Sequence, residues 1–137
     1  MGFARWTFRA AGLYGLTITF PLYFMEDRIG KDFPPAITHP DIYYGFIGVV
    51  IAWQIAFLII STQPDRFRPL MLAAVVEKFS YGIATALLFS SHRIAAAALG
   101  LGVIDTFLGL MFLIAFWLTR PVLSQKFETE LVRSTES

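Results

Sequence analysis

Four apolar stretches, each about as long as a bilayer core is thick, constrain this chain more than any other feature. They cover about residues 6–25, 42–62, 70–89 and 94–119. An α-helix rises about 1.5 Å per residue, so about 20 residues cross a hydrocarbon core roughly 30 Å thick. A soluble domain of 137 residues could not bury so much apolar surface in one core. The sequence therefore predicts an all-α protein, a four-transmembrane-helix antiparallel bundle over residues 1–120.

The composition agrees and excludes several kinds of site. Hydrophobic residues make up 56% of the chain and charged residues 15%, against about a quarter charged in a soluble domain. The near balance of 11 basic and 10 acidic residues gives no footprint for nucleic acid. With no cysteine, thiolate metal sites and iron–sulfur clusters are excluded. The two histidines, His39 and His92, fall in connecting segments, so a buried bis-histidine haem is not expected and no motif specifies a cofactor.

The connecting segments predict the order of the helices. Residues 26–40 form a loop rich in charge and proline, whereas residues 63–69 and 90–93 are short turns. Short turns join antiparallel neighbours, so the last three helices should form an up-down series. We interpret the first stretch as a retained helix kinked at Pro21, since no small-residue cleavage site follows it.

Basic residues predict the orientation. With a cytoplasmic N-terminus, seven basic residues lie inside and three lie outside, which favours two cytoplasmic termini. The inner seven are Arg5, Arg9, Arg66, Arg68, Arg120, Lys126 and Arg133, and the outer three are Arg28, Lys31 and Arg93. In the cytoplasmic tail, residues 121–137, the four-residue spacing of Leu123, Phe127 and Leu131 is typical of a short amphipathic helix, with a frayed end as the alternative.

Small residues repeat along three of the expected helices and indicate where backbones approach closely. These stripes are Ala11, Gly15 and Thr19; Gly48, Ala52 and Ala56; and Ala98, Gly102 and Gly109. Trp53 lies in mid-span, where packing on lipid or a neighbouring helix explains it better than stacking on a cofactor.

Polar residues inside the spans form the most informative pattern. Glu77 and Asp105 are equally far from the centre of the turn that joins their helices, and Gln54 and Glu77 are equally far from the centre of the preceding turn. Antiparallel helices therefore bring these three residues to one depth. Lys78 and Tyr81 lie beside them in sequence, and Tyr81 shares a helix face with Glu77.

Burying these charges has a cost that predicts pairing. A charge at the centre of a span costs about 2.5–3.5 kcal/mol on insertion scales. Lys78 points about 100° away from Glu77 around the helix and is expected to extend toward the cytoplasmic side. Two acids and one base leave one negative charge, so either one carboxyl is protonated or a basic ligand joins them. Whether Asp105 or Thr106 faces the interior depends on the rotation of the fourth helix.

The second span, YYGFIGVVIAWQIAFLII, the following QPDRFRPLMLAAVVEKFSYG and the glycine- and aspartate-bearing fourth span resemble small bacterial four-helix membrane proteins of the DoxX-like group. The resemblance covers about residues 42–118 and transfers no catalytic residue. It implies a multi-pass protein of a bacterial inner membrane with an unknown or accessory role.

Several functions are compatible with this pattern, and a purely structural role for the polar layer is one reading of it. The leading hypothesis is an accessory subunit of a membrane complex, or a binder of an apolar ligand such as lipid or quinone. A proton or small-cation transporter, acting as a homo-oligomer through Glu77 and Asp105, is the alternative. A membrane enzyme such as an isomerase ranks third. The ligand-binding or proton-relay candidates are Gln54, Glu77, Lys78, Tyr81 and Asp105.

Overall fold

The computed structural model describes residues 1–120, so the expected tail helix lies outside the described residues. Six helical segments follow one another along this part of the chain. They are α1 (Gly2–Thr19), the 3-10 helix η1 (Phe20–Phe24), α2 (Glu26–Asp32), α3 (Pro40–Thr62), α4 (Arg68–Ser90) and α5 (Ala96–Leu118). Pro21 lies in the first turn of η1, so the chain tightens from α-helix to 3-10 helix near the expected kink.

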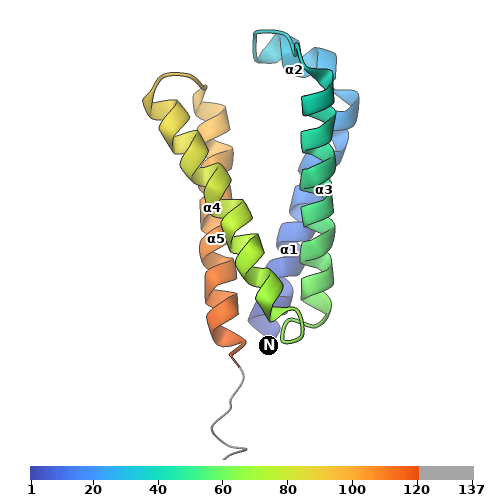
Figure 1. Ribbon diagram of the computed structural model, residues 1–137, viewed down its shortest axis with the longest axis vertical. Coiled ribbons are helices and arrows are strands. Elements are labelled where there is room, and N and C mark those ends of the chain that lie inside the picture. The colour runs from blue at the N-terminus through green and yellow to red at the C-terminus, as the bar shows by residue number, and fades with distance from the viewer. Residues whose placement is uncertain (121–137) are drawn as a thin grey trace, which may run out of the picture.

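The long helices are arranged as two antiparallel pairs (Figure 1). α1 packs along α3, and α4 packs along α5. The pairs meet at the end of the molecule that holds the N-terminus and the turn between α3 and α4, and they diverge toward the other end. The predicted packing of α3 against α4 is therefore wrong over much of their length: these helices are joined by a short turn but splay apart.

Three of the described helices are long and apolar enough to cross a membrane, namely α3, α4 and α5. Only 22–28% of the residues in their most apolar windows are buried within the protein. The rest of this apolar surface needs a non-aqueous environment, because water-soluble monomers rarely expose continuous apolar patches of such extent. The chain is thus a helical membrane protein, and α1 is a further N-terminal helix packed on α3.

Close backbone approach explains why these particular helices pair. A Cβ atom added to Gly12 on α1 would lie 2.9 Å from the carbonyl oxygen of Gln54 and 2.9 Å from Leu58, both on α3. On α5, Gly102 lies so close to Thr85 of α4 that a Cβ atom there would overlap the threonine side chain. On the expected stripe of α3, Ala52 is exposed, whereas Gly48 and Ala56 are half-buried.

Aromatic side chains hold the two pairs together where they meet. The rings of Phe8 and Phe112 are stacked with their centroids 4.1 Å apart, and Phe57 meets Phe112 edge-on at 4.9 Å. All three side chains are fully buried and come from α1, α3 and α5. Such contacts add about 0.5–1.5 kcal/mol per pair beyond area burial, so this cluster is the anchor of the fold.

The segment predicted as a loop, residues 26–40, begins with a helix, which corrects the expectation. Glu26 and Asp27 lie in the first turn of α2 and Lys31 in its last turn, an order that suits the helix dipole. Arg28 and Asp32 form an exposed ion pair of 3.4 Å one turn apart. The prolines that suggested a loop follow the end of this helix and only terminate it.

Candidate functional site: a cavity with a charged floor

A cavity of about 390 Å³ lies between the two helix pairs, and all five candidate residues line it. Its volume falls within the range of about 300–1,000 Å³ that small-molecule sites occupy. The walls toward the diverging ends of the pairs are mostly apolar, including Leu22, Phe46 and Leu101. The charged residues lie deeper, next to the phenylalanine cluster of Phe8, Phe57 and Phe112. The cavity thus has apolar walls and a charged floor.

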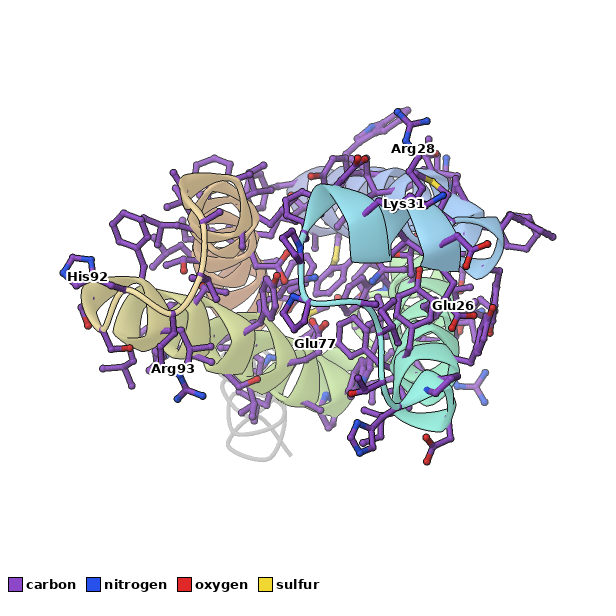
Figure 2. All side chains as sticks on the ribbon, turned by 90° about the horizontal axis from the view of Figure 1, so that it is seen from above. Glu26, Arg28, Lys31, Glu77, His92 and Arg93 are labelled. Atoms are coloured by element: carbon purple, nitrogen blue, oxygen red, sulfur yellow. The ribbon has the colours of Figure 1, made fainter. Side chains whose placement is uncertain are left out.

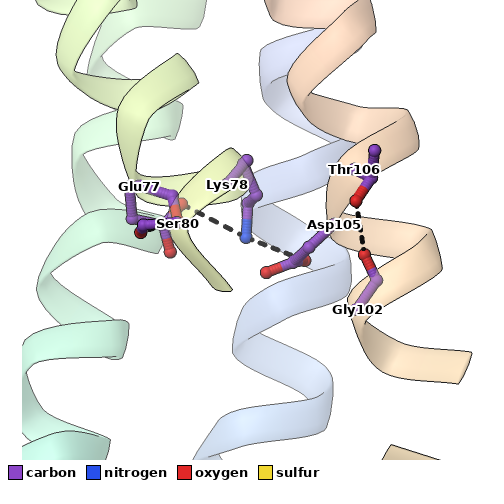
Figure 3. Close-up of polar contacts among 6 residues, drawn as sticks. All are labelled: Glu77, Lys78, Ser80, Gly102, Asp105 and Thr106. Atoms are coloured by element: carbon purple, nitrogen blue, oxygen red, sulfur yellow. Dashed lines mark hydrogen bonds and ion pairs between the residues drawn. The ribbon is translucent and has the colours of Figure 1, made fainter. Parts of the chain in front are cut away.

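Lys78 is the centre of the charged group (Figure 3). Its Nζ lies 3.1 Å from Oδ1 of Asp105 and 3.4 Å from Oε2 of Glu77. Only 5% of Lys78 is exposed, so the expectation that it reaches the cytoplasmic side is wrong. The buried side chains of Met71 and Ala74 fill the next turns of α4 in that direction, and Nζ lies 5.4 Å from the ring of Phe57. With that route blocked, the ammonium group is directed at the carboxylates.

The hydrogen-bonding capacity of the Glu77 carboxylate is only partly used. Its Oε2 is buried and accepts no hydrogen bond within residues 1–120. The 3.4 Å separation from Lys78 Nζ is an ion-pair distance without hydrogen-bond geometry. Viewed along the helices, Glu77 lies between the two pairs, whereas Arg28, His92 and Arg93 lie at the periphery (Figure 2). One acceptor atom at the floor of the cavity is therefore open to a donor.

Asp105 faces the cavity, whereas its neighbour Thr106 faces α4. Asp105 Oδ1 accepts a hydrogen bond from Lys78, while Thr106 Oγ1 donates to the carbonyl oxygen of Gly102 at 2.8 Å (Figure 3). The Thr106 hydroxyl also lies against Gly82 of α4. The close approach of α4 and α5 at these glycines fixes the rotation of α5. The expected pairing of buried charges is thus present between Lys78 and Asp105.

Gln54 supplies a neutral polar group from the opposite pair. It is 2% exposed and lies directly against Gly15, which has no side chain to displace it. Gln54 also lines the cavity. Tyr81 lies half-buried on the same wall as Glu77.

Trp53, Tyr14 and Ser80 are among the lining residues that were not predicted as site residues. Trp53 packs against Phe57, as expected for contact with a neighbouring residue, and it also lines the cavity, which was not expected. Tyr14 and Ser80 line it as well. Ser80 follows Glu77 by three residues, a spacing that places both on one helix face and could have indicated it. No comparable signal marks Tyr14, because the divergence of the helix pairs is not encoded in a local pattern.

The chemistry of the site follows from its charges. One ammonium group lies within ion-pair distance of two carboxylates in a cavity with apolar walls. Within residues 1–120, no group of three or more histidine, aspartate or glutamate side chains could hold a metal ion. The arrangement can accept hydrogen bonds, compensate positive charge and exchange protons.

Comparison with known proteins gives no match: no protein-family model, curated protein or solved structure is similar to this chain.

Proposed function

We propose that this protein is a four-span protein of a bacterial inner membrane that binds an amphipathic ligand between its helix pairs. The fourth span is α1 continued by η1. Its 18 α-helical and 5 3-10 residues extend about 27 Å and about 10 Å, which together suffice to cross a bilayer core. α1 packs along α3, one of the membrane-length helices, so it shares the depth of α3.

The charges at the two ends support an orientation with both termini cytoplasmic. The end where the pairs meet carries Arg5, Arg66 and Arg68 in or near helix termini. The opposite end carries Arg28, Lys31 and Arg93, with the acids Glu26 and Asp27 beside the first two. Positively charged short segments remain in the cytoplasm. The resemblance to DoxX-like proteins is consistent with this placement.

The observation that carries the binding proposal is the cavity itself. Its walls are mostly apolar, and its floor holds the buried Gln54 side chain and a buried Glu77 oxygen that accepts no hydrogen bond within residues 1–120. Apolar walls with a few convergent polar groups are typical of ligand sites. A lipid or quinone with a polar head at the floor would fill such a space, whether the protein acts alone or as an accessory subunit.

Tryptophan fluorescence tests this proposal. The chain has three tryptophans; Trp6 and Trp117 are exposed, whereas Trp53 lines the cavity. A variant with Trp6→Phe and Trp117→Phe leaves Trp53 as the only reporter. Addition of a quinone or a brominated lipid in neutral detergent should quench Trp53 in a saturable way.

A matched pair of substitutions on α4 provides the control. Ser80→Phe places a ring in the cavity and should abolish saturable quenching. Val76→Phe adds the same ring at a position on α4 that is 67% exposed and outside the cavity, so quenching should persist. Quenching that is linear and equal in both variants would mean that Trp53 senses only bulk lipid, and the binding proposal would fail.

Proton or small-cation transport is the second candidate, favoured by one observation: two mid-helix carboxylates share a single ammonium group. Such intramembrane acids act in proton relays. Flux through liposomes containing the protein should then fall in the double variant Glu77→Gln with Asp105→Asn. Equal flux with and without these substitutions would exclude this candidate.

A further inference from the structure

We infer that the ligand of this cavity is a lipophilic amine, with its ammonium group at the acidic floor and its apolar body along the walls. This inference rests on the proposed function and specifies the chemistry of its ligand. Three independent features of the site carry it: the charge of the floor, the open acceptor and the aromatic walls.

One more cation would balance the charge of the floor. Glu77 and Asp105 share Lys78, which lies 3.4 Å and 3.1 Å from their nearest carboxylate oxygens. No other basic side chain of the described residues lines the cavity. With both acids ionised, the group carries one uncompensated negative charge. A bound ammonium group would give two positive and two negative charges, and pairing is what makes buried charges tolerable.

The polar groups at the floor fit a donor-rich head group. Glu77 Oε2 is a buried acceptor without a donor in the described part of the chain. Gln54, which is 2% exposed, adds a neutral polar side chain to the lining of the same cavity. A primary ammonium group offers three donors and no acceptor. A carboxylate, sulfate or phosphate head group would instead meet Glu77 and Asp105 as like charges.

The walls next to the floor are aromatic. Tyr14, Trp53 and Tyr81 line the cavity from α1, α3 and α4. Aromatic faces attract cations, and tryptophan and tyrosine do so with the added benefit of excluding water from the charge. A contact of this kind is already present at the floor, where Lys78 Nζ lies 5.4 Å from the Phe57 ring. Beyond this level, Phe46 and Leu101 offer apolar contacts to a hydrocarbon body.

Three probes with the same ten-carbon chain test the inference: decylamine, decanol and decyl sulfate. Each is titrated in neutral detergent into the protein whose only tryptophan is Trp53, and the signal of the Ser80→Phe form is subtracted. The amine should bind at least tenfold more tightly than the alcohol, and the sulfate should not bind specifically. If the alcohol binds as tightly as the amine, this inference is overturned and the binding proposal stands. If none of the three binds, both are overturned.

Substitutions at two adjacent residues should change the affinity for the amine in opposite directions, which a purely structural role of these residues would not produce. Glu77→Gln removes one negative charge and should weaken amine binding at least tenfold, with decanol binding unchanged. Lys78→Met removes the competing cation and should tighten amine binding. Glu26→Gln, at the outer end and outside the cavity, is the control and should leave both affinities unchanged. If Lys78→Met does not fold, Glu77→Gln decides alone: an unchanged preference for the amine would contradict the inference.

Discussion

Lys78 on α4 and Asp105 on α5 are joined by a hydrogen-bonded ion pair of 3.1 Å that lies inside the protein, beside the cavity. The two residues are 27 positions apart in sequence. Their helices pack through Gly82 and Gly102, so the pair lies within the tightest interface of the structure. A charge pair in this position stabilises one rotation of α5 relative to α4, and breaking it leaves a charge without a partner.

Lys78→Ala should therefore destabilise the protein strongly. Removing one partner of a buried pair costs about 3–5 kcal/mol, because the other charge remains buried. Here two carboxylates lose the one cation that pairs with them within residues 1–120. Unfolding in mixed micelles with increasing dodecyl sulfate measures the change in the free energy of unfolding. The triple variant Lys78→Met, Glu77→Gln and Asp105→Asn should lose less than Lys78→Ala, and an equal or greater loss would contradict charge burial as the cause.

Helix pairing through glycine gives a second prediction. Gly12→Ala should destabilise the protein by about 1–3 kcal/mol, the usual cost of overpacking. The added methyl group would meet the backbone oxygen of Gln54 and the Leu58 side chain, both at 2.9 Å. Gly45→Ala on α3 is the control, since nothing lies within 4 Å of its added Cβ. That substitution should be neutral or stabilising by about 0.5–1 kcal/mol, and a similar loss at both positions would argue against close packing of α1 on α3.

The topology can be tested with introduced cysteines, because the chain has none of its own. In whole cells, a membrane-impermeant maleimide should label Thr38→Cys and Ser91→Cys, which lie in the connections at the diverging end. Gly2→Cys and Asp65→Cys should be labelled only after the cells are permeabilised. Labelling of Gly2→Cys together with Thr38→Cys in intact cells would mean that α1 does not cross the membrane.

The helical segments could be predicted from the sequence, whereas their arrangement in pairs could not. Runs of about 20 apolar residues require helices in lipid, because every backbone polar group must be satisfied within the segment. This constraint is local, and α3 begins at Pro40, close to the expected residue 42. Which helix packs on which depends on single contacts such as Gly15 against Gln54. Those contacts join residues that are far apart in sequence.

The polar group was predictable in its members but not in its geometry. Equal distances from a turn place Glu77 and Asp105 at one depth, and that relation needs only helical regularity. The path of the Lys78 side chain depends on what fills the neighbouring space, here Met71 and Ala74. The cavity exists because α3 and α4 diverge after the turn that joins them. No residue pattern in either helix predicts that divergence.

The last prediction separates a binding role for the charged floor from a structural one. Glu77→Gln should stabilise the ligand-free protein by about 1 kcal/mol, since it removes a buried negative charge that no cation fully compensates. Asp105→Asn should do the opposite, because Asp105 is the hydrogen-bonded partner of Lys78. Thermal unfolding of the purified, delipidated variants in neutral detergent measures both changes in stability in one experiment. A binding site can hold such an uncompensated acid because a bound cationic ligand neutralises its charge. If Glu77→Gln lowers the unfolding temperature as Asp105→Asn does, both acids stabilise the helix pair and the charged floor serves packing rather than binding.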